Sequence, residues 1–230
     1  MALKEDLIAF CGDIFREHWS HIDGRVVPES KDLPLNNTGK TINAAVLYAD
    51  LDQSTSLVDT KTKEFSAEVY KAFLRSASRI ISANGGAIRS FDGDRVMGIF
   101  VGDTKCDDAA KAGLQIKWAM LHAINPAAKA VYADAPTIKH TVGIDVSDLL
   151  VVRAGMRNSN DLVWVGKAAN HAAKLNTFTP DYATRVTAEV YAQMTNQTRV
   201  GGNPSRHMWE KDPDVRYGRS VFRSNWSWSP

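Results

Sequence analysis

The chain has 230 residues, of which 44% are hydrophobic and 23% charged, proportions that are ordinary for one globular domain with short extensions. Its formal net charge of +2 excludes the strong positive field with which proteins attract nucleic acids or anionic membranes, so neither partner is indicated. Two cysteines, Cys11 and Cys106, form no CxxC motif, which favours reduced, buried thiols in a cytoplasmic protein over a disulfide or a zinc site.

The N-terminal region, residues 1–41, is predicted to be a helix followed by a linker. Apolar residues such as Ile14 and Trp19 recur at helical spacing over residues 3–19, and we expect this apolar stripe to pack on a partner surface. Acidic residues interrupt the segment, so it is neither a signal peptide nor a membrane span. The stretch 24–41 contains two prolines and two asparagines, a composition typical of a linker.

The central part of the chain, residues 42–196, is predicted to have an α+β fold. The expected elements, in chain order, are a strand at 44–50, a helix at 64–83, strands at 87–91 and 95–101, a helix at 107–124, strands near 138–146 and 161–165, a helix at 167–177, a strand at 184–187 and a helix to about 195. This succession suggests an α/β sandwich with a ferredoxin-like, antiparallel-rich sheet and flanking helices. Residues 197–230 are expected to form a covering arm or an edge hairpin.

Two acidic residues are expected to meet where the first strand ends and the next hairpin turns. Asp50 ends the strand at 44–50, and Asp92-Gly93 is a strong two-residue turn signal that places Asp94 at the tip of the hairpin. In a ferredoxin-like sheet the first strand lies beside that hairpin, so the two carboxylates would repel each other unless a cation lay between them. Magnesium suits such oxygen ligands and keeps positions open for phosphate oxygens.

The polar residues after the first strand extend this prediction. Gln53, Ser54 and Thr55 lead into a helix, and the free backbone N–H groups of such a turn suit phosphate oxygens. Carboxylates that can bind a metal ion, next to backbone N–H groups that can bind phosphate, predict a nucleoside triphosphate site. Each motif alone also has an ordinary structural explanation, because Asp-Gly is common in hairpins and acids often cap helices. By strand alternation, Asp52 and Asp92 can point the same way as the proposed metal ligands.

A third motif, NDLVWVGKAANHAAKLN at residues 160–176, is typical of a strand, a glycine and a helix. Asn170 and Lys174 are four residues apart and share one face of that helix. The alternative is an ordinary exposed polar stripe on a helix whose HAAKL segment packs inward. His171 and the distant His140 are interpreted as packing or surface residues rather than catalytic bases.

Together, the motifs VLYADLDQST, GGAIRSFDGDRVMGIF and LVWVGKAANHAAKL resemble the catalytic domain of class III nucleotidyl cyclases over roughly residues 42–195. The resemblance implies two divalent metal ions, Mg²⁺ or Mn²⁺, held by Asp50, Asp94 and the backbone carbonyl of Leu51.

The resemblance also implies roles for the third motif. Asn170 would orient the ribose, and Lys174 stands where the family usually has an arginine that stabilises the transferring phosphate, which keeps the positive charge but not the planar fork. Family members build each site between two antiparallel subunits, with the acids on one and the asparagine helix on the other. A homodimer with two equivalent sites is therefore expected.

The base-contacting positions differ from those of adenine-selective members, which have a lysine and an aspartate where this chain has Ser90 and Lys167. Lysine is only a donor, so Lys167 would pair with a uracil carbonyl but not with the amino group of adenine or cytosine. Arg89 would occupy the lysine position only with a one-residue gap, which the hairpin register disfavours. Tyr48 lies two residues before Asp50, on the same side of the strand, and would shrink the base pocket toward a pyrimidine; alternatively it merely packs with its hydroxyl satisfied.

These features resemble the bacterial antiphage pyrimidine cyclases of the Pycsar type. The resemblance implies that UTP, or CTP as second choice, is converted to the 3′,5′-cyclic monophosphate and pyrophosphate, and that the product is a second messenger for a cyclic-nucleotide-binding effector. Three alternatives remain: a class III adenylate or guanylate cyclase with atypical base contacts, a catalytically inactive nucleotide-binding sensor, and a polymerase-like palm, which the short chain and modest charge disfavour.

Overall fold

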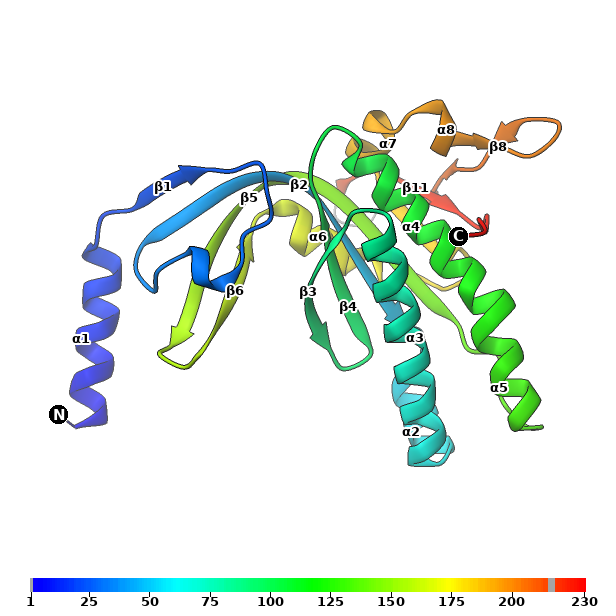
Figure 1. The fold of residues 1–230 in the computed structure, drawn as a ribbon, viewed down its shortest axis with the longest axis horizontal. Helices are drawn as coiled ribbons and strands as arrows, with labels where there is room; N and C mark the ends of the chain where they lie inside the picture. Colours follow the sequence, from blue (N-terminus) through cyan, green and yellow to red (C-terminus); the bar gives the residue numbers. More distant parts are fainter. Residues whose placement is uncertain (1, 215–217) are drawn as a thin grey trace.

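The computed structural model describes residues 2–214 and 218–230, which are organised around one mixed sheet (Figure 1). The strands of this sheet are β1 (Ser20–Asp23), β2 (Thr38–Leu51), β3 (Ala87–Asp92), β4 (Arg95–Phe100), β5 (His140–Met156), β6 (Ser159–Val165), β7 (Thr184–Thr187), β10 (Glu210–Lys211) and β11 (Val221–Ser224). Two short strands, β8 (Val200–Gly201) and β9 (Arg206–His207), pair with each other outside it.

The strand order places β2 at the centre of the fold. It runs β10-β11-β7-β5-β2-β4-β3, with β1 beside β2 and β6 beside β5. The pairs β1–β2 and β5–β7 are parallel, and the other pairs are antiparallel. The predicted α+β fold with an antiparallel-rich sheet is therefore confirmed, and β2 does lie beside the β3–β4 hairpin.

The helices are α1 (Leu3–Arg16), α2 (Ser54–Thr60), α3 (Lys63–Ala83), α4 (Lys105–Ala119), α5 (Asn125–Val131), α6 (Lys167–Leu175), α7 (Ala188–Gln193) and α8 (Asn196–Arg199), with a 3₁₀ turn η1 (Ser30–Asp32) and a π-helical turn η2 (Met120–Ile124). In the described part of the chain, no helix combines the length and the apolar composition needed to cross a bilayer.

The two faces of the sheet carry different helices because successive residues of a strand point to opposite sides. Odd-numbered residues of β2, such as Leu47 and Ala49, are buried in the main core with α3 and α4. Even-numbered residues, such as Ala44 and Val46, join the alanines of α6 in a second core, and Tyr48 packs against it. Residues of even number in β2 therefore face the same side as α6.

Several elements differ from the expectation, among them β2, the helix α2 and the helix expected at 107–124. β2 begins at Thr38, inside the expected linker, because it pairs with β5 from Gly39 opposite Val152 to Leu51 opposite His140. The short helix α2 was not predicted. The helix expected at 107–124 instead continues through the π-helical turn into α5.

A buried asparagine marks the π-helical turn. The Asn125 side chain donates to the carbonyls of Met120 and Ile138, at 3.0 and 2.9 Å, and accepts from the Ile138 N–H at 2.8 Å. These bonds satisfy the buried side-chain amide of Asn125 and join the turn to the segment that leads into β5.

The two ends of the described chain behave differently. Helix α1 buries none of its residues and stands apart from the body in Figure 1, tied to it by the Asn37 side chain, which donates to the carbonyls of Ile14 and Glu17. Cys11 on α1 is exposed, so the expectation of a buried thiol is wrong there, whereas Cys106 is buried and its pKa is raised by burial to about 11. At the other end, β10 and β11 lengthen the sheet beyond β7 as an edge pair.

Candidate active site

Asp50 lies near the end of β2, and a guanidinium group covers it. Arg95, the first residue of β4, donates to Asp50 Oδ2 from both Nε and Nη2, at 3.2 and 2.7 Å. Burial raises the pKa of Asp50, the hydrogen bond and charge of Arg95 lower it, and the negative charge of Asp94 raises it again, with a net increase. Asp50 and Asp94 are therefore close enough to repel each other, as expected for two acids at this junction.

Asp94 lies at the tip of the β3–β4 hairpin. The preceding Gly93 has φ +59°, the left-handed conformation that a two-residue hairpin turn requires and that glycine adopts without steric cost. Asp94 Oδ2 is buried, and no described residue donates a hydrogen bond to it. A buried carboxylate oxygen without a donor, next to a second carboxylate, is the arrangement that a divalent cation stabilises.

These oxygen donors fit a hard cation, but only as a partial shell. Among the described residues, no group of three or more His, Cys, Asp or Glu side chains gathers into a metal site. A cation at Asp50 and Asp94 would therefore need further oxygen ligands, such as the backbone carbonyl of Leu51, substrate phosphates or water. Magnesium typically binds in this way, through one or two carboxylates and the phosphates of a substrate.

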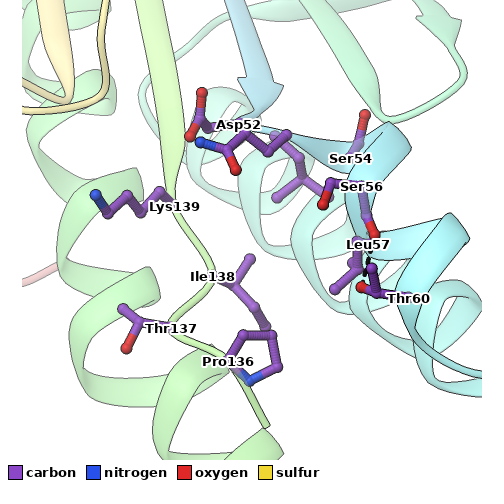
Figure 2. Close-up of a pocket in the computed structure, with 11 residues that line it drawn as sticks. Asp52, Ser54, Ser56, Leu57, Thr60, Pro136, Thr137, Ile138 and Lys139 are labelled. Carbon is purple, nitrogen blue, oxygen red and sulfur yellow. Dashed lines mark hydrogen bonds between the residues drawn. The ribbon is translucent and has the colours of Figure 1, made fainter.

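The two neighbouring acids are placed differently. Asp52 lies beyond the end of β2 and lines a polar cavity of about 240 Å³ between α2 and residues 136–139, and neither Asp50 nor Asp94 lines that cavity (Figure 2). Burial raises the pKa of Asp52, and Lys139 across the cavity lowers it. Asp92 is exposed at the end of β3, opposite Arg95. Strand alternation alone did not distinguish Asp52 and Asp92 from Asp50 and Asp94. Alternation applies only within a strand, and β2 ends at Leu51 and β3 at Asp92.

The turn after β2 leads directly into the short helix α2. Gln53 has φ 55° and ψ 34°, a left-handed conformation that is uncommon outside glycine, and it caps α2, which begins at Ser54. The first N–H groups of a helix, here those of Ser54 and Thr55, have no partners within it. Ser54 also lines the cavity of Asp52.

Tyr48 and Ser90, the two positions on β2 and β3 that are expected to contact the base, lie on the same line of paired residues across the sheet. Tyr48 on β2 pairs with Met97 on β4, and Met97 pairs with Ser90 on β3, after an irregularity between Ile88 and Ser90 shifts the register. Residues paired across adjacent strands point to the same face, so Tyr48 and Ser90 flank Met97 on the α6 side. Arg89 is engaged elsewhere, in an ion pair with Glu29 at 3.0 Å.

Tyr48 lies between the hairpin and α6. On its other side it pairs with Gly143 of β5, where a Cβ atom would lie 2.2 Å from the carbonyl oxygen of Ala172 in α6. The Arg95 guanidinium carbon is 5.9 Å from the centroid of the Tyr48 ring. Burial raises the pKa of the half-buried Tyr48 hydroxyl. The ring therefore belongs to the same surface as Asp50, with Arg95 touching both.

Helix α6 presents three polar residues away from the sheet. Its alanines Ala168 and Ala172 are buried against the second core, whereas Lys167, Asn170 and Lys174, at positions i, i+3 and i+7, are exposed on the opposite side. The residues predicted for the site thus fall into two groups on the chain: the hairpin half, with Asp50, Asp94, Tyr48 and Ser90, and the helix half, with Lys167, Asn170 and Lys174.

Sequence reasoning missed Arg95. The available signal was its position directly after the turn: the antiparallel register, continued one step past the pair of Ala49 and Val96, places Arg95 opposite Asp50. The two histidines are packing residues, as expected. His140 is buried beside Phe73, with its pKa lowered by burial to about 3, and His171 faces Asp145, with Nδ1 3.1 Å from Oδ2.

Comparison with known proteins places this geometry in a family. No protein-family model matches the chain. It is 44% identical over 231 residues to a uridylate cyclase from Xanthomonas perforans, covering 99% of each chain, and 42% identical over 231 residues to a uridylate cyclase from Burkholderia cepacia, covering 100% of each.

Solved structures show the same fold at lower sequence identity. The adenylyl cyclase CyaB from P. aeruginosa matches with a TM-score of 0.71 and 17% identity, over 83% of this chain and 97% of that one. A guanylyl cyclase matches with a TM-score of 0.68 and 17% identity, over 84% of this chain and 96% of that one. With relatives of this identity along its whole length, the chain belongs to the family of the bacterial uridylate cyclases, and it is a nucleotidyl cyclase with the class III fold.

Proposed function

We propose that the chain is a uridylate cyclase that converts UTP to the 3′,5′-cyclic monophosphate and pyrophosphate, with CTP as the second candidate substrate. The observation that carries this proposal is the position of Tyr48, which stands on the same line of paired residues as Ser90 and beside Arg95, one alternation step from Asp50. A phenol ring here narrows the space between hairpin and α6, so a one-ring base is favoured over a purine. The names of the relatives agree with this choice of substrate.

The hairpin half would hold the metal ions. Asp50, Asp94 and the carbonyl of Leu51 are the proposed ligands, and the orphaned Asp94 Oδ2 supports them. Divalent cations at such a site supply Lewis acidity, which lowers the pKa of the ribose 3′-hydroxyl and neutralises charge on the phosphates. Arg95 must then share Asp50 with a cation, because both compete for the same carboxylate.

The remaining residues bind and orient the nucleotide. The N–H groups from Gln53 to Thr55 would bind the phosphates. Asn170 would hold the ribose so that O3′ attacks the α-phosphorus in line. The O3′ proton passes to solvent water, the bond from the α-phosphorus to the bridging oxygen breaks, and pyrophosphate leaves with both bonding electrons. Lys174 would stabilise the negative charge that develops on the phosphate. Most of the rate enhancement then comes from positioning and charge.

The two halves of the site require a second copy of the chain. Lys167, Asn170 and Lys174 point away from their own sheet, so the helix half of one chain would complete the hairpin half of another. In a two-fold symmetric homodimer this arrangement gives two identical sites. Lys167 of one chain would then donate to a carbonyl oxygen of the uracil that is bound in the hairpin half of the other chain.

The product is proposed to act as a second messenger in antiphage defence, through an effector that binds cyclic nucleotides. In this reading the protein works in the cytoplasm and needs neither nucleic acid nor membrane. The enzyme's part in such a system is testable by its product alone.

The deciding experiment incubates the purified chain with each of the four nucleoside triphosphates and Mg²⁺ or Mn²⁺. Cyclic UMP is expected as the main product, whereas cyclic CMP as the main product would identify CTP, the second candidate, as the substrate. A dominant purine product would show that the base assignment is wrong, and no cyclic product from any nucleotide would favour an inactive sensor. Asp50→Asn and Asp94→Asn should each abolish turnover, whereas Asp92→Asn, on the same hairpin, should retain it.

A further inference from the structure

A buried carboxylate lies behind α6, outside the proposed metal site. Asp145 on β5 is 0% exposed. Its Oδ1 accepts from Thr187 Oγ1 at 2.5 Å, and its Oδ2 lies 3.1 Å from both His171 Nδ1 and Arg219 Nη1. The three partners come from the end of β7, from α6 and from the segment before β11. One side chain thus joins three parts of the chain that are distant in sequence.

Arg219 bridges the carboxylate and the histidine. Its Nη1 lies 3.1 Å from Asp145 Oδ2 and 2.9 Å from His171 Nδ1, and its Nη2 lies 3.4 Å from Glu189 Oε1. A guanidinium group can only donate and a carboxylate can only accept, so in either tautomer His171 Nδ1 makes one hydrogen bond with this pair, accepting from Arg219 or donating to Asp145. The geometry therefore ties His171 of α6 to the C-terminal segment through Arg219.

This polar contact is a specific element in the packing of α6, besides the hydrogen bond from the Ala168 N–H to Ser147 Oγ. The buried face of the helix consists largely of Ala168, Ala169 and Ala172, which allow close approach to β5 but interlock little. His171 is the neighbour of Asn170 in sequence, so any force that fixes the ring also fixes the direction in which Asn170 points.

Stability alone is a weak reason for such a pair. A buried ion pair is often no better for stability than apolar residues of similar volume, because desolvation offsets the attraction. Its directional hydrogen bonds do, however, select one orientation of the groups that they join. An orientation is what a ribose-binding residue needs, since a displacement of about 1 Å in a reacting group can cost on the order of a hundredfold in rate.

We infer that Asp145, Arg219 and His171 form a latch by which the C-terminal segment positions α6, and with it Asn170, for catalysis. The inference rests on the proposed function, in which Asn170 orients the ribose of the nucleotide. The three latch residues are positioning residues, because Asp145 and Arg219 hold His171 where α6 packs on β5, whereas Asn170 is exposed on the helix. The latch makes residues beyond the cyclase core part of the catalytic apparatus.

The first test removes the latch contacts one at a time in the full-length chain. His171→Leu keeps the buried Asp145–Arg219 pair, and Arg219→Met keeps the bond between Asp145 and Thr187. Each variant is expected to lower kcat by about tenfold or more while KM for the nucleotide changes less than about threefold, because phosphate and metal contacts stay intact. Arg219→Lys should recover part of the loss. Arg223→Met, which breaks an ion pair with Glu210 in the same C-terminal segment, is the matched control and should keep wild-type kcat.

A double-mutant cycle separates positioning from general damage. In an Asn170→Ala background there is no ribose contact left to misplace, so His171→Leu and Arg219→Met should cost little further activity. An undiminished loss in that background would overturn the latch, and so would wild-type kcat in His171→Leu. If Arg219→Met does not fold, His171→Leu alone decides, since it leaves no buried charge unpaired.

The same cycle distinguishes the failure of the latch from the failure of the proposed function. If Asn170→Ala retains wild-type turnover, the assignment of Asn170 is wrong and the proposed mechanism fails with it. If Asn170→Ala is impaired but both latch variants are fully active, the mechanism stands and only the latch is refuted.

Discussion

Arg95 donates two hydrogen bonds to a single oxygen of Asp50. The neighbouring carboxylate, that of Asp94, has a buried oxygen, Oδ2, to which no described residue donates a hydrogen bond. The guanidinium thus compensates one of two adjacent carboxylates and leaves the other uncompensated. Burial by itself lowers the pKa of Arg95, but its bond to Asp50 outweighs that effect and raises it. Arg95 acts as an internal cation at the position where a metal ion is proposed to bind.

Replacing Arg95 should strengthen metal binding. In Arg95→Gln the competing positive charge is lost, so the affinity of the nucleotide-free chain for Mn²⁺ is expected to rise by about threefold to tenfold, equivalent to about 0.7 to 1.4 kcal/mol. Calorimetric titration with Mn²⁺ measures this directly, without relying on turnover. The control is Arg223→Gln, because Arg223 on β11 pairs with neither Asp50 nor Asp94; this variant should bind Mn²⁺ like the wild type. Weaker Mn²⁺ binding by Arg95→Gln would contradict the competition.

Tyr48 should control the size of the base that is accepted. Tyr48→Ala opens the space between the hairpin and α6, and the ratio of kcat/KM for UTP over ATP is expected to fall by about tenfold or more. Tyr48→Phe preserves the ring and serves as the control for the hydroxyl group. If Tyr48→Phe loses selectivity as much as Tyr48→Ala does, the hydroxyl rather than ring size selects the base.

Two impaired variants should restore each other if the site is shared between chains. Asp94→Asn damages the hairpin half and Asn170→Ala the helix half, so a mixed dimer contains one site with both halves intact. With random exchange, mixing equal amounts should recover about a quarter of the wild-type activity. Mixing Asp94→Asn with Asp50→Asn, which damages the same half twice, is the control and should recover nothing. Equal recovery in both mixtures would exclude a shared site.

Lys117 gives a pH dependence away from the active site. It donates to the carbonyl of Asn225, and burial lowers its pKa to about 8 from 10.5. Between about pH 8 and pH 10.5, Lys117 is therefore protonated in the unfolded chain but deprotonated in the folded chain. The free energy of unfolding consequently rises as the pH increases through this range. The Tm of the wild type minus the Tm of Lys117→Met should increase from pH 8 to 10.5. Exposed Lys129→Met should follow the wild type throughout.

Local signals were sufficient for much of the fold. The Asp-Gly turn located the β3–β4 hairpin, alternation located the strands around it, and the apolar periodicity of α3 predicted that helix to within a residue. These features depend on backbone conformation and on the burial of neighbours in sequence, so they can be read from short windows. The meeting of Asp50 and Asp94 also followed, because a strand next to a hairpin in a known topology brings their ends together.

Longer-range features could not be read in this way. The extent of β2 was underestimated because its first residues, polar and next to asparagines, become a strand only by pairing with β5. The placement of Asp52 in a separate cavity depends on where β2 stops, and the left-handed Gln53 depends on how α2 then turns. Neither is encoded in a local pattern of hydrophobicity.

The sequence by itself determined the kind of protein: a cyclase-like sheet, two acids at a hairpin, and a helix that carries Asn170 and Lys174. Tertiary structure alone decided the electrostatics, because the charges that matter meet across long separations. Arg95 reaches Asp50 across a strand pair, and Arg219 reaches Asp145 from the far end of the chain. Such pairings form only when burial brings the groups together, since a charge removed from water must find a partner in space, whatever its place in the sequence.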